Sequence, residues 1–341
     1  MRGWRIVNPA YFYNFVSVME TMESIRRTFE SYLQSLDYSH EPDNLYAPVR
    51  YVLSLGGKRI RPVLLMMAYN MYGDDLTKAL PAAAGIEIFH NFTLLHDDVM
   101  DRAEMRRGNP TVHVKWNENV AILSGDAMTF VAYQYLARVA PECLKAVLDV
   151  ANETFLGVTD GQQYDMDFET RNDVTVPEYM EMIRLKTSVL LAAALEIGAI
   201  LGGASEEDSH LLYDFGEKTG LAFQLQDDML DVYGDPKVFG KNIGGDIMCN
   251  KKTFMYINAR LLADADTNRE LDMWEVYDGP AENKIKGVTS IYDRLGVKEI
   301  CQKEIDSLFE QALAALDRVS VPEERKMPLR SVAYSLMNRK L

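Results

Sequence analysis

The chain has 341 residues, of which 48% are hydrophobic and 26% are charged, and its formal net charge is −15. So acidic a protein is poorly suited to nucleic acids and to anionic membrane surfaces, both of which are bound by basic surfaces. No stretch approaches the roughly 20 uninterrupted apolar residues of a membrane span, and no secretory leader pattern opens the chain. Three cysteines without CxxC spacing are typical of thiols in a reducing compartment. These features predict a cytoplasmic protein that spans no membrane and binds no nucleic acid.

Helical signals dominate the chain. Residues that favour helices fill long segments, which are separated by short breaks containing Gly, Pro or Asp. The segments expected to be helical are 82–96, 119–139, 143–165, 178–201 and 206–232. The stretch 264–290 is polar and interrupted by Gly279-Pro280 and Gly287, so we expect an irregular surface excursion there. Without clear strand patterns, the sequence predicts an all-α fold in a single domain over residues 1–341, with an N-terminal helical segment over 1–44.

Residues 56–62, GGKRIRP, are the first feature with a chemical signal. Two glycines allow a tight backbone turn, and Pro62 suits the first turn of a following helix. Three cations stand beside this turn in an otherwise acidic chain. A single Lys or Arg here would be interpreted as a solvated surface charge, but the group together suits a phosphate ligand.

Two acidic triplets each follow an apolar segment that is predicted to be a buried helix. Their members are Asp97, Asp98 and Asp101, and Asp227, Asp228 and Asp231. The first and last Asp of a triplet are four residues apart and therefore lie on one helical face. Carboxylates near the negative end of a helix repel one another, and divalent cations relieve that repulsion. Since Mg²⁺ takes one or two carboxylates and completes its shell with water and phosphate, the triplets predict magnesium–diphosphate sites.

The plainer interpretation of such a triplet is a solvated acidic helix face. One copy is weak evidence in an Asp-rich chain, but two copies after apolar helices favour the metal interpretation. Further cations accompany the triplets, namely Arg106, Arg107, Lys186, Lys241, Lys251 and Lys252. Carboxylate-held Mg²⁺ together with such cations suits a diphosphate better than either group does alone.

These features occur together in a known family. In order, the chain contains GGKRIRP, EIFHNFTLLHDDVMDRAEMRRGNPTVH, SGDAM, GQQYD, RLKTS, FQLQDDMLD and GKNIGGDIMCNKKT. From about residue 45 to its end, the chain resembles the trans-isoprenyl (all-E polyprenyl) diphosphate synthases of short-chain geranylgeranyl or farnesyl type. The resemblance implies a homodimer of all-α subunits of the isoprenoid synthase type, each with a central cavity. It also implies that an allylic diphosphate (dimethylallyl, geranyl or farnesyl) ionises, that isopentenyl diphosphate attacks the cation, and that proton loss gives a trans product five carbons longer.

The resemblance further implies metal ligands. Three Mg²⁺ ions are expected with bound diphosphate, and the residues that would bind them directly are Asp97, Asp101 and Asp227. The residues that would support or hydrate these ions are Asp98, Asp228, Asp231 and Asp246. The released diphosphate is the expected acceptor of the proton, because no side-chain base is evident.

Roles in substrate binding and catalysis are implied in the same way. The allylic diphosphate would be held by Arg106, Lys186 and Lys241, with Lys251 near it. The isopentenyl diphosphate would be held by Lys58, Arg61, His90 and Arg107, with Phe223 near it. Thr187 and Gln224, with the Lys186 carbonyl, would direct their dipoles at the developing carbocation, while Gln162 and Asp165 would line the site. The tail Asn338-Arg339-Lys340 resembles a basic C-terminus that can close over the site.

An aromatic stripe precedes the first triplet and bears on product length. Phe92, Phe89 and Ile86 lie five, eight and eleven residues before Asp97, on one helical face. The two positions nearest the triplet are those four and five residues before Asp97, occupied here by the small Thr93 and by Phe92. In the family, a single aromatic residue at the farther of these two positions is typical of a twenty-carbon product. The prediction is therefore a geranylgeranyl diphosphate synthase ahead of a farnesyl diphosphate synthase. The alternative is that both phenylalanines are ordinary core residues.

Three other classes of protein fit these motifs less well. A terpene cyclase also uses an aspartate-rich helix with Mg²⁺, but its second metal motif has Asn or Asp, Ser or Thr, and Glu at wider spacing. A non-catalytic partner subunit of a heteromeric synthase typically lacks one Asp triplet, whereas both are intact here. A helical scaffold would need neither six carboxylates at helix ends nor the accompanying cations, so the sequence favours an enzyme.

Overall fold

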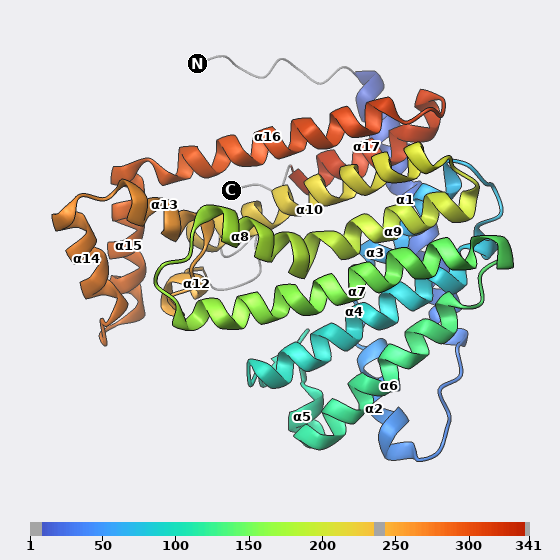
Figure 1. Cartoon of the computed structure of the whole chain (residues 1–341), viewed down its shortest axis with the longest axis horizontal. Coiled ribbons are helices and arrows are strands. Elements are labelled where there is room, and N and C mark those ends of the chain that lie inside the picture. The colour runs from blue at the N-terminus through green and yellow to red at the C-terminus, as the bar shows by residue number, and fades with distance from the viewer. Residues whose placement is uncertain (1–8, 235–242, 338–341) are drawn as a thin grey trace. The chain divides into compact units, whose positions relative to one another are not determined.

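The computed structural model describes the backbone of residues 9–234 and 243–337, and the side chains from residue 22 onward within those ranges. Nearly all of this part of the chain is helical (Figure 1). The strands found in it are β1 (Met105–Arg106) and β2 (Asn109–Pro110), which pair antiparallel. The predicted all-α class is confirmed.

The contacts within the chain divide it into two compact units. Unit 1 comprises Met1–Ala151, Ala193–Leu212 and Ser320–Ser331, and unit 2 comprises Asn152–Ala192, Tyr213–Val319 and Val332–Leu341. Four helices contribute residues to both units, namely α7 (Pro141–Thr170), α9 (Val189–Gly202), α10 (Glu206–Tyr233) and α17 (Glu323–Met337). The single domain and the central cavity expected from the sequence stay predictions.

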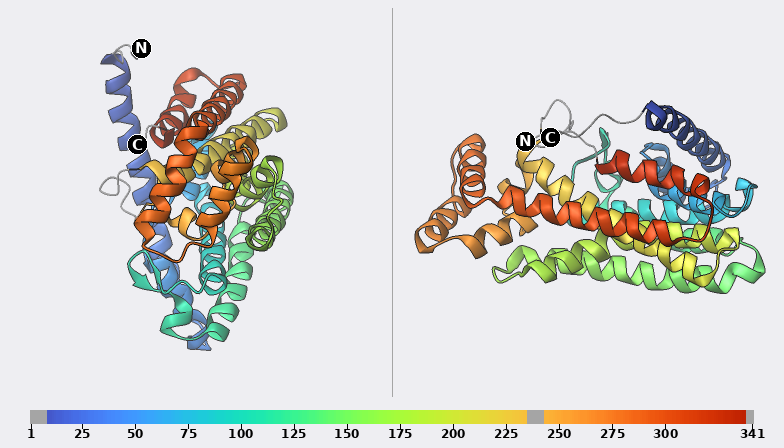
Figure 2. Two further views of the ribbon diagram at one scale, coloured as in Figure 1. Left: turned by 90° about the vertical axis from the view of Figure 1, so that its left-hand side faces the viewer. Right: turned by 90° about the horizontal axis from the view of Figure 1, so that it is seen from above.

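Unit 1 is organised around a long apolar helix. Its elements are α1 (Pro9–Ser35), α2 (Asp43–Ser54), α3 (Ile60–Asn70), η1 (Leu76–Lys78), α4 (Leu80–Met100), the two strands, α5 (Val112–Lys115) and α6 (Glu118–Leu136). Helix α4 begins with a proline in its first turn and is buried through most of its length. It packs along α6, beside which it lies in both views (Figures 1 and 2). The acidic end of α4 therefore belongs to a buried helix that is packed along its length.

Unit 2 contains the second half of the helical set. Its elements are α8 (Val176–Ile183), η2 (Arg184–Ser188), α12 (Gly245–Met248), α13 (Phe254–Leu262), α14 (Ala265–Glu275), α15 (Ala281–Leu295) and α16 (Val297–Arg318). A hydrophobic core formed by α8, α10, α13, α15 and α16 holds these helices together. The residues of α10 that carry the second acidic triplet belong to this unit.

The five predicted helices are present with slightly shifted ends. They correspond to α4, α6, α7, the continuous stretch from α8 to α9, and α10. The stretch from α8 to α9 differs from the prediction in its middle turn, because Arg184–Ser188 is π-helical. Such single-turn π segments frequently mark functional sites.

The irregular excursion predicted at 264–290 is wrong, because this segment forms α14 and the start of α15. Pro280 occupies the N-cap of α15, so it begins a helix there. Gly287 lies within α15, where the indole ring of Trp274 packs against it and leaves no room for a side chain. Leu271 of α14 and Ile291 of α15 are buried in the core of unit 2, so the segment is part of the folded unit.

One helical stretch in the described ranges, Val176–Gly202, is long and apolar enough to cross a membrane. However, 67% of its most apolar window is buried inside the protein. A core helix of a globular protein has the same composition, so the burial favours that interpretation.

Candidate functional site

The first acidic triplet lies at the C-terminal end of α4, in unit 1. Asp97 and Asp98 occupy the last turn and Asp101 is the C-cap. Successive helical residues point about 100° apart, so the outer two Asp share one face while Asp98 points toward the core. The side chain of Asp98 is only 7% exposed, against 21% for Asp97. The middle carboxylate is therefore buried, whereas the outer two are more accessible to solvent.

Arg106 is the partner of this buried carboxylate. Its Nε and Nη2 donate to Oδ1 of Asp98 at 2.7 and 2.6 Å, and Nη2 lies 3.8 Å from Asp97. Burial nevertheless raises the pKa of Asp98, with Arg106 opposing the shift. Arg106 stands on the small hairpin, where Arg107 and Gly108 both have positive φ, 52° and 75°. A two-residue turn of this kind closes a hairpin tightly, and the sequence analysis did not predict it.

The hairpin brings the two basic groups of unit 1 together. Arg107 donates from Nη1 to the Gly56 carbonyl, and its guanidinium lies against Gly57. Gly56 and Gly57 have φ of 74° and 144°, which confirms the tight turn predicted there. Lys58 follows this turn and is exposed to solvent. Segments almost fifty residues apart thus form one basic cluster, consisting of Lys58, Arg61, Arg106 and Arg107.

Arg61 of this cluster contacts His90 of α4, with Nη1 3.2 Å from Nε2. Burial, together with the arginines around it, lowers the pKa of His90 well below its usual value. The imidazole is therefore neutral near pH 7, and Nε2 can accept a hydrogen bond from Arg61. Burial also lowers the pKa of Arg61.

Arg59, the third cation of GGKRIRP, turns inward instead. It is 5% exposed, adopts a left-handed conformation with φ 49°, and pairs with the buried carboxylate of Glu87. Glu87 also accepts a hydrogen bond from Asn91 at 3.0 Å. The sequence analysis missed Glu87, although a lone carboxylate within the apolar segment 82–96 signals a buried ion pair. The pair ties the glycine turn to the helix that carries the acidic triplet.

The aromatic stripe lies on α4 as predicted. Phe89 is 2% exposed and Phe92 is half-buried, and their ring centroids are 5.3 Å apart. The ring of His96 meets Phe92 edge-on at 4.8 Å. Both phenylalanines thus precede the triplet on the helix that carries it.

The second acidic triplet lies near the end of α10, in unit 2, and repeats the pattern of the first. Asp228 is 4% exposed, while Asp227 and Asp231 are half-buried. Oδ2 of Asp228 accepts a hydrogen bond from the hydroxyl of Tyr179, and Oδ1 accepts one from Nε2 of Gln224 at 3.1 Å. Burial raises the pKa of Asp228 to about 7, and the bond from Tyr179 opposes this shift. In both triplets, therefore, the middle Asp is buried and hydrogen-bonded to other side chains of the protein.

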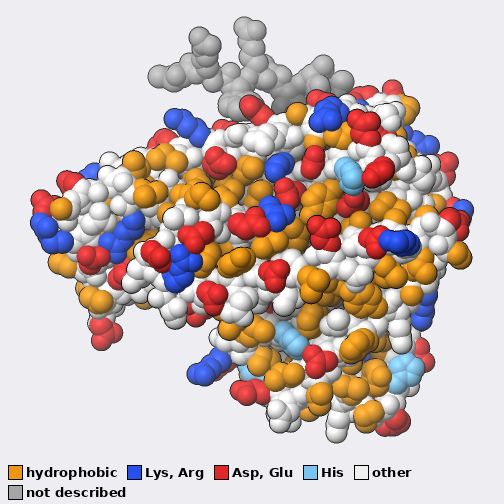
Figure 3. Space-filling view, viewed as in Figure 1, with side chains coloured by type: hydrophobic (Ala, Val, Ile, Leu, Met, Phe, Trp, Pro, Cys, Tyr) orange, Lys and Arg blue, Asp and Glu red, His pale blue; other side chains and the backbone are white. Residues whose placement is uncertain are grey.

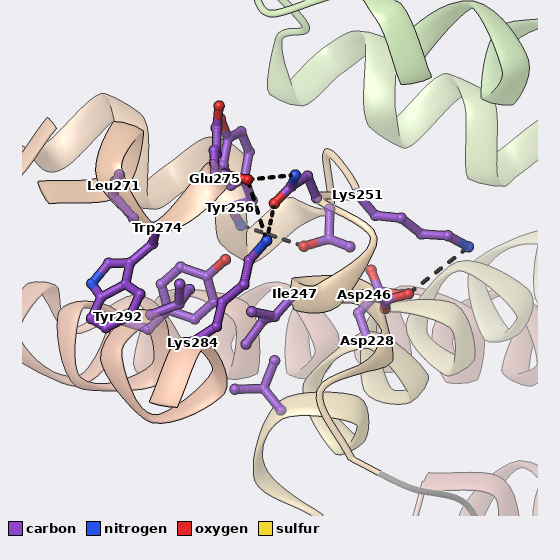
Figure 4. A pocket seen from close by; sticks show the side chains of 14 residues that line it. Asp228, Asp246, Ile247, Lys251, Tyr256, Leu271, Trp274, Glu275, Lys284 and Tyr292 are labelled. Carbon is purple, nitrogen blue, oxygen red and sulfur yellow. Dashed lines mark hydrogen bonds and ion pairs between the residues drawn. The ribbon is translucent and has the colours of Figure 1, made fainter. Parts of the chain in front are cut away.

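Asp231 holds the segment that follows the triplet. Its carboxylate accepts hydrogen bonds from the backbone N–H groups of Gly245 and Asp246, at 3.3 and 3.0 Å. These two N–H groups belong to the first turn of α12, where a carboxylate is favoured. Asp246 and Lys251 lie in this region, and their charged atoms are 3.9 Å apart (Figure 4).

The two adjacent lysines of this region differ in their exposure. Lys251 extends into solvent with its side chain 58% exposed, whereas the Lys252 side chain is 7% exposed. Lys252 lies 3.9 Å from Glu275 and over the ring of Tyr256. The choice of Lys251 over Lys252 as the candidate ligand of a diphosphate stays a prediction.

The π-helical turn η2 presents Lys186 and Thr187. Two glycines allow neighbouring helices to approach it, because a side chain at Gly161 would lie 2.3 Å from the Lys186 backbone nitrogen and one at Gly220 would lie 2.9 Å from Ser188. Lys186 forms an ion pair with Asp165, which lies on the same helix as Gly161. The acid of the GQQYD segment is therefore the ion-pair partner of Lys186.

Thr187 Oγ1 lies 3.5 Å from Oε1 of Gln224, so two of the predicted dipoles are adjacent. Gln162 of α7 and Phe223 of α10 are half-buried in the same unit. Lys241 and the tail 338–340 lie outside the described residues. Tyr179, seven residues before Lys186 in the same continuous helical stretch, was not predicted from the sequence.

Carboxylate oxygens are the ligands that Mg²⁺ prefers, so the chemistry of both triplets fits this ion. Among the residues that the structure describes, no group of three or more His, Cys, Asp or Glu side chains is close enough to enclose a metal alone. Mg²⁺ does not need such a cage, since it takes one or two carboxylates and keeps waters and substrate phosphate in its shell.

Comparisons with known proteins agree with these features. The model of the polyprenyl synthetase family matches residues 42–295. The geranylgeranyl diphosphate synthase of Methanosarcina mazei is 48% identical over 220 residues, which cover 64% of this chain and 68% of that protein. The short chain isoprenyl diphosphate synthase of Methanothermobacter thermautotrophicus is 37% identical over 312 residues, which cover 90% and 92%.

Two solved structures are also similar to this chain. A geranylgeranyl pyrophosphate synthase is 44% identical, with a TM-score of 0.89 over 94% of this chain and 99% of that one. The geranylgeranyl pyrophosphate synthetase of Pyrococcus horikoshii is 32% identical, with a TM-score of 0.85 over 97% and 100%.

Proposed function

Because the chain belongs to the polyprenyl synthetase family and is a prenyltransferase, we propose that it elongates an allylic diphosphate with isopentenyl diphosphate. The primer is dimethylallyl, geranyl or farnesyl diphosphate, and the product is a short-chain trans-prenyl diphosphate. Geranylgeranyl diphosphate is favoured over farnesyl diphosphate for two reasons. Similar proteins are named for it, and of the two positions nearest the first triplet only the farther one, Phe92, is aromatic.

The observation that carries this proposal is the shared architecture of the two triplets. In each, the middle Asp is buried and bonded to protein donors, while the outer two lie on the more accessible side of the helix. Asp97, Asp101 and Asp227 would bind Mg²⁺ directly, and Asp98, Asp228 and Asp231 would hold the triplets in place. Three ions are expected. When bound, Mg²⁺ would neutralise the charge that develops on the leaving diphosphate.

The basic residues would bind the two diphosphates. The cluster in unit 1 suits isopentenyl diphosphate through Lys58, Arg61 and Arg107, with neutral His90 supporting Arg61. The allylic diphosphate would be held by Arg106, Lys186, Lys241 and Lys251. Phe223 and Gln162 would line the site.

Catalysis would use two kinds of group. Arg106, Lys186 and Lys241 would stabilise the leaving diphosphate, whose charge grows in the transition state. Thr187 and Gln224 would place oxygen atoms toward the carbocation, since a weak dipole stabilises that cation without attacking it. The remaining apolar walls would exclude water, which would quench it.

An exposed apolar face on α6 supports a homodimer. Ile122, Leu123 and Phe130 are 43%, 58% and 70% exposed. Figure 3 shows hydrophobic side chains gathered on this part of unit 1. Such a face favours burial against a second copy, so Phe130→Glu should shift the protein toward monomer in size-exclusion chromatography. Val276→Glu, at an equally exposed apolar position in unit 2, should not. The homodimer is expected in the cytoplasm.

Product sizing tests the proposed function. The purified protein is incubated with isopentenyl diphosphate, Mg²⁺ and each allylic primer in turn, and the chain lengths of the products are measured. Asp227→Asn should reduce elongation by orders of magnitude, whereas Asp278→Asn, at an exposed Asp of the same unit, should leave it unchanged. Failure of the wild-type protein to elongate any primer would refute the proposal.

A further inference from the structure

A buried tyrosine beside the second acidic triplet has no role in the proposed function. Tyr179 of α8 is 3% exposed, and its hydroxyl donates to Oδ2 of Asp228. Burial and the neighbouring carboxylate raise the pKa of this phenol, so it keeps its proton and remains a donor. The bond joins the helix that leads into η2 to the helix that carries the triplet.

Asp228 transmits this contact to Gln224. Its other oxygen, Oδ1, accepts a hydrogen bond from Nε2 of Gln224, one helical turn earlier on α10, at 3.1 Å. In this geometry the Gln224 amide presents its NH₂ group to Asp228, whose ionised form only accepts hydrogen bonds. Its carbonyl oxygen Oε1 then points away from Asp228, toward Thr187 Oγ1 at 3.5 Å. The direction of this amide dipole is therefore decided by Asp228.

We propose that Tyr179 is a positioning residue, which acts through Asp228 to hold the carbonyl oxygen of Gln224 toward the developing carbocation. The inference rests on the proposed function, which places Gln224 beside the reacting allylic carbon. A carbonyl oxygen there stabilises positive charge, whereas the NH₂ edge of the same amide opposes it. The correct orientation is therefore favoured more in the transition state than in the ground state, and its loss should lower kcat more than it raises KM.

Removing the tyrosine hydroxyl should release this arrangement. With one oxygen unbonded, the Asp228 carboxylate can rotate away from Gln224, whose amide can then adopt both orientations. A merely structural role for Tyr179 would instead lower the amount of folded protein, whatever residue occupies position 224. The two roles are distinguished by whether the effect depends on Gln224.

A double-mutant cycle measures this dependence. Wild type, Tyr179→Phe, Gln224→Met and the double variant are compared in steady-state condensation at saturating Mg²⁺. Tyr179→Phe should lower kcat about tenfold, the size expected for a lost hydrogen bond to a charged group, with both KM values within about twofold. In the Gln224→Met background the same change should lower kcat by less than about twofold. Equal losses in both backgrounds, or wild-type kcat in Tyr179→Phe, would overturn the inference.

A matched control and a second variant complete the experiment. Tyr233→Phe removes another hydroxyl–carboxylate bond of unit 2, 2.9 Å long to Asp293, and should leave kcat unchanged in both backgrounds. If Tyr179→Phe does not fold, Tyr179→Met replaces it, because the adaptable methionine side chain fills much of the same space and also lacks a hydroxyl. It should lower kcat with Gln224 present and have little further effect without it, and equal losses would again overturn the inference. An inactive wild-type protein would refute the proposed function itself, whereas an active one with equal losses refutes only the role of Tyr179.

Discussion

Phe92 should set the length of the product. Its half-buried ring lies between those of Phe89 and His96, with centroids at 5.3 and 4.8 Å. At about 1.5 Å per helical residue, Phe92 stands ~7.5 Å and Phe89 ~12 Å before Asp97 along α4. If the hydrocarbon chain grows along this face, Phe92 is the first of the two phenylalanines that it meets.

Replacing Phe92 by Ala should let the hydrocarbon chain reach Phe89, which would then form the floor of its pocket about 4.5 Å further along the helix. One isoprene unit adds four main-chain carbons, which extend about 5 Å at ordinary carbon–carbon bond lengths. The expected result is a product longer by one unit, twenty-five carbons in place of twenty. The double change Phe92→Ala with Phe89→Ala should lengthen the product again.

The assay is product sizing after incubation with isopentenyl diphosphate and farnesyl diphosphate. Phe309→Ala is the matched control, because Phe309 is also half-buried and pairs with an aromatic ring, that of Tyr334, at 5.2 Å in unit 2. It should leave the product length unchanged. An active Phe92→Ala variant with an unchanged product would remove Phe92 from the floor of the pocket.

Three further predictions concern stability, pH and metal. Arg59→Met leaves the carboxylate of Glu87 buried without its charge partner, so it should lower the unfolding free energy in urea by about 3–5 kcal/mol. The double variant with Glu87→Met should recover most of this loss, and an equal loss would contradict the reasoning. His90 has its pKa lowered by burial and nearby arginines, so only the unfolded state gains its proton near pH 6.5. The stability that His90 contributes is therefore complete above about pH 6.5 and lost as the pH falls below it. His90→Asn should flatten this acid-side slope in urea titrations and exposed His40→Asn should not; an unchanged slope would refute a neutral His90. Chelation of Mg²⁺ should abolish condensation, and added Mg²⁺ should restore it. The Asp227→Asn variant should require a higher Mg²⁺ concentration for its half-maximal rate. An unshifted Mg²⁺ requirement would exclude Asp227 as a ligand.

The clearest difference between the structure predicted from the sequence and the observed one lies at 264–290. Local signals there, a Gly-Pro pair and an isolated glycine, indicate breaks, because they report backbone preference alone. In the structure Pro280 starts a helix, and the ring of Trp274 fills the space beside Gly287. Neither effect can be read from neighbouring residues. Local composition likewise did not predict the π-helical turn, against which Gly161 and Gly220 of other helices pack closely.

By itself the sequence determined that the two triplets stand at the ends of apolar helices and that their outer Asp share a face. Both conclusions follow from helical periodicity and local composition. The partners of the two middle Asp were decided only by the tertiary structure, since Arg106 stands on a hairpin and Tyr179 on another helix. The inward turn of Arg59 toward Glu87 and the burial of Lys252 beside Glu275 were also decided there. Each of these depends on which elements pack together, so no spacing along the chain specifies it.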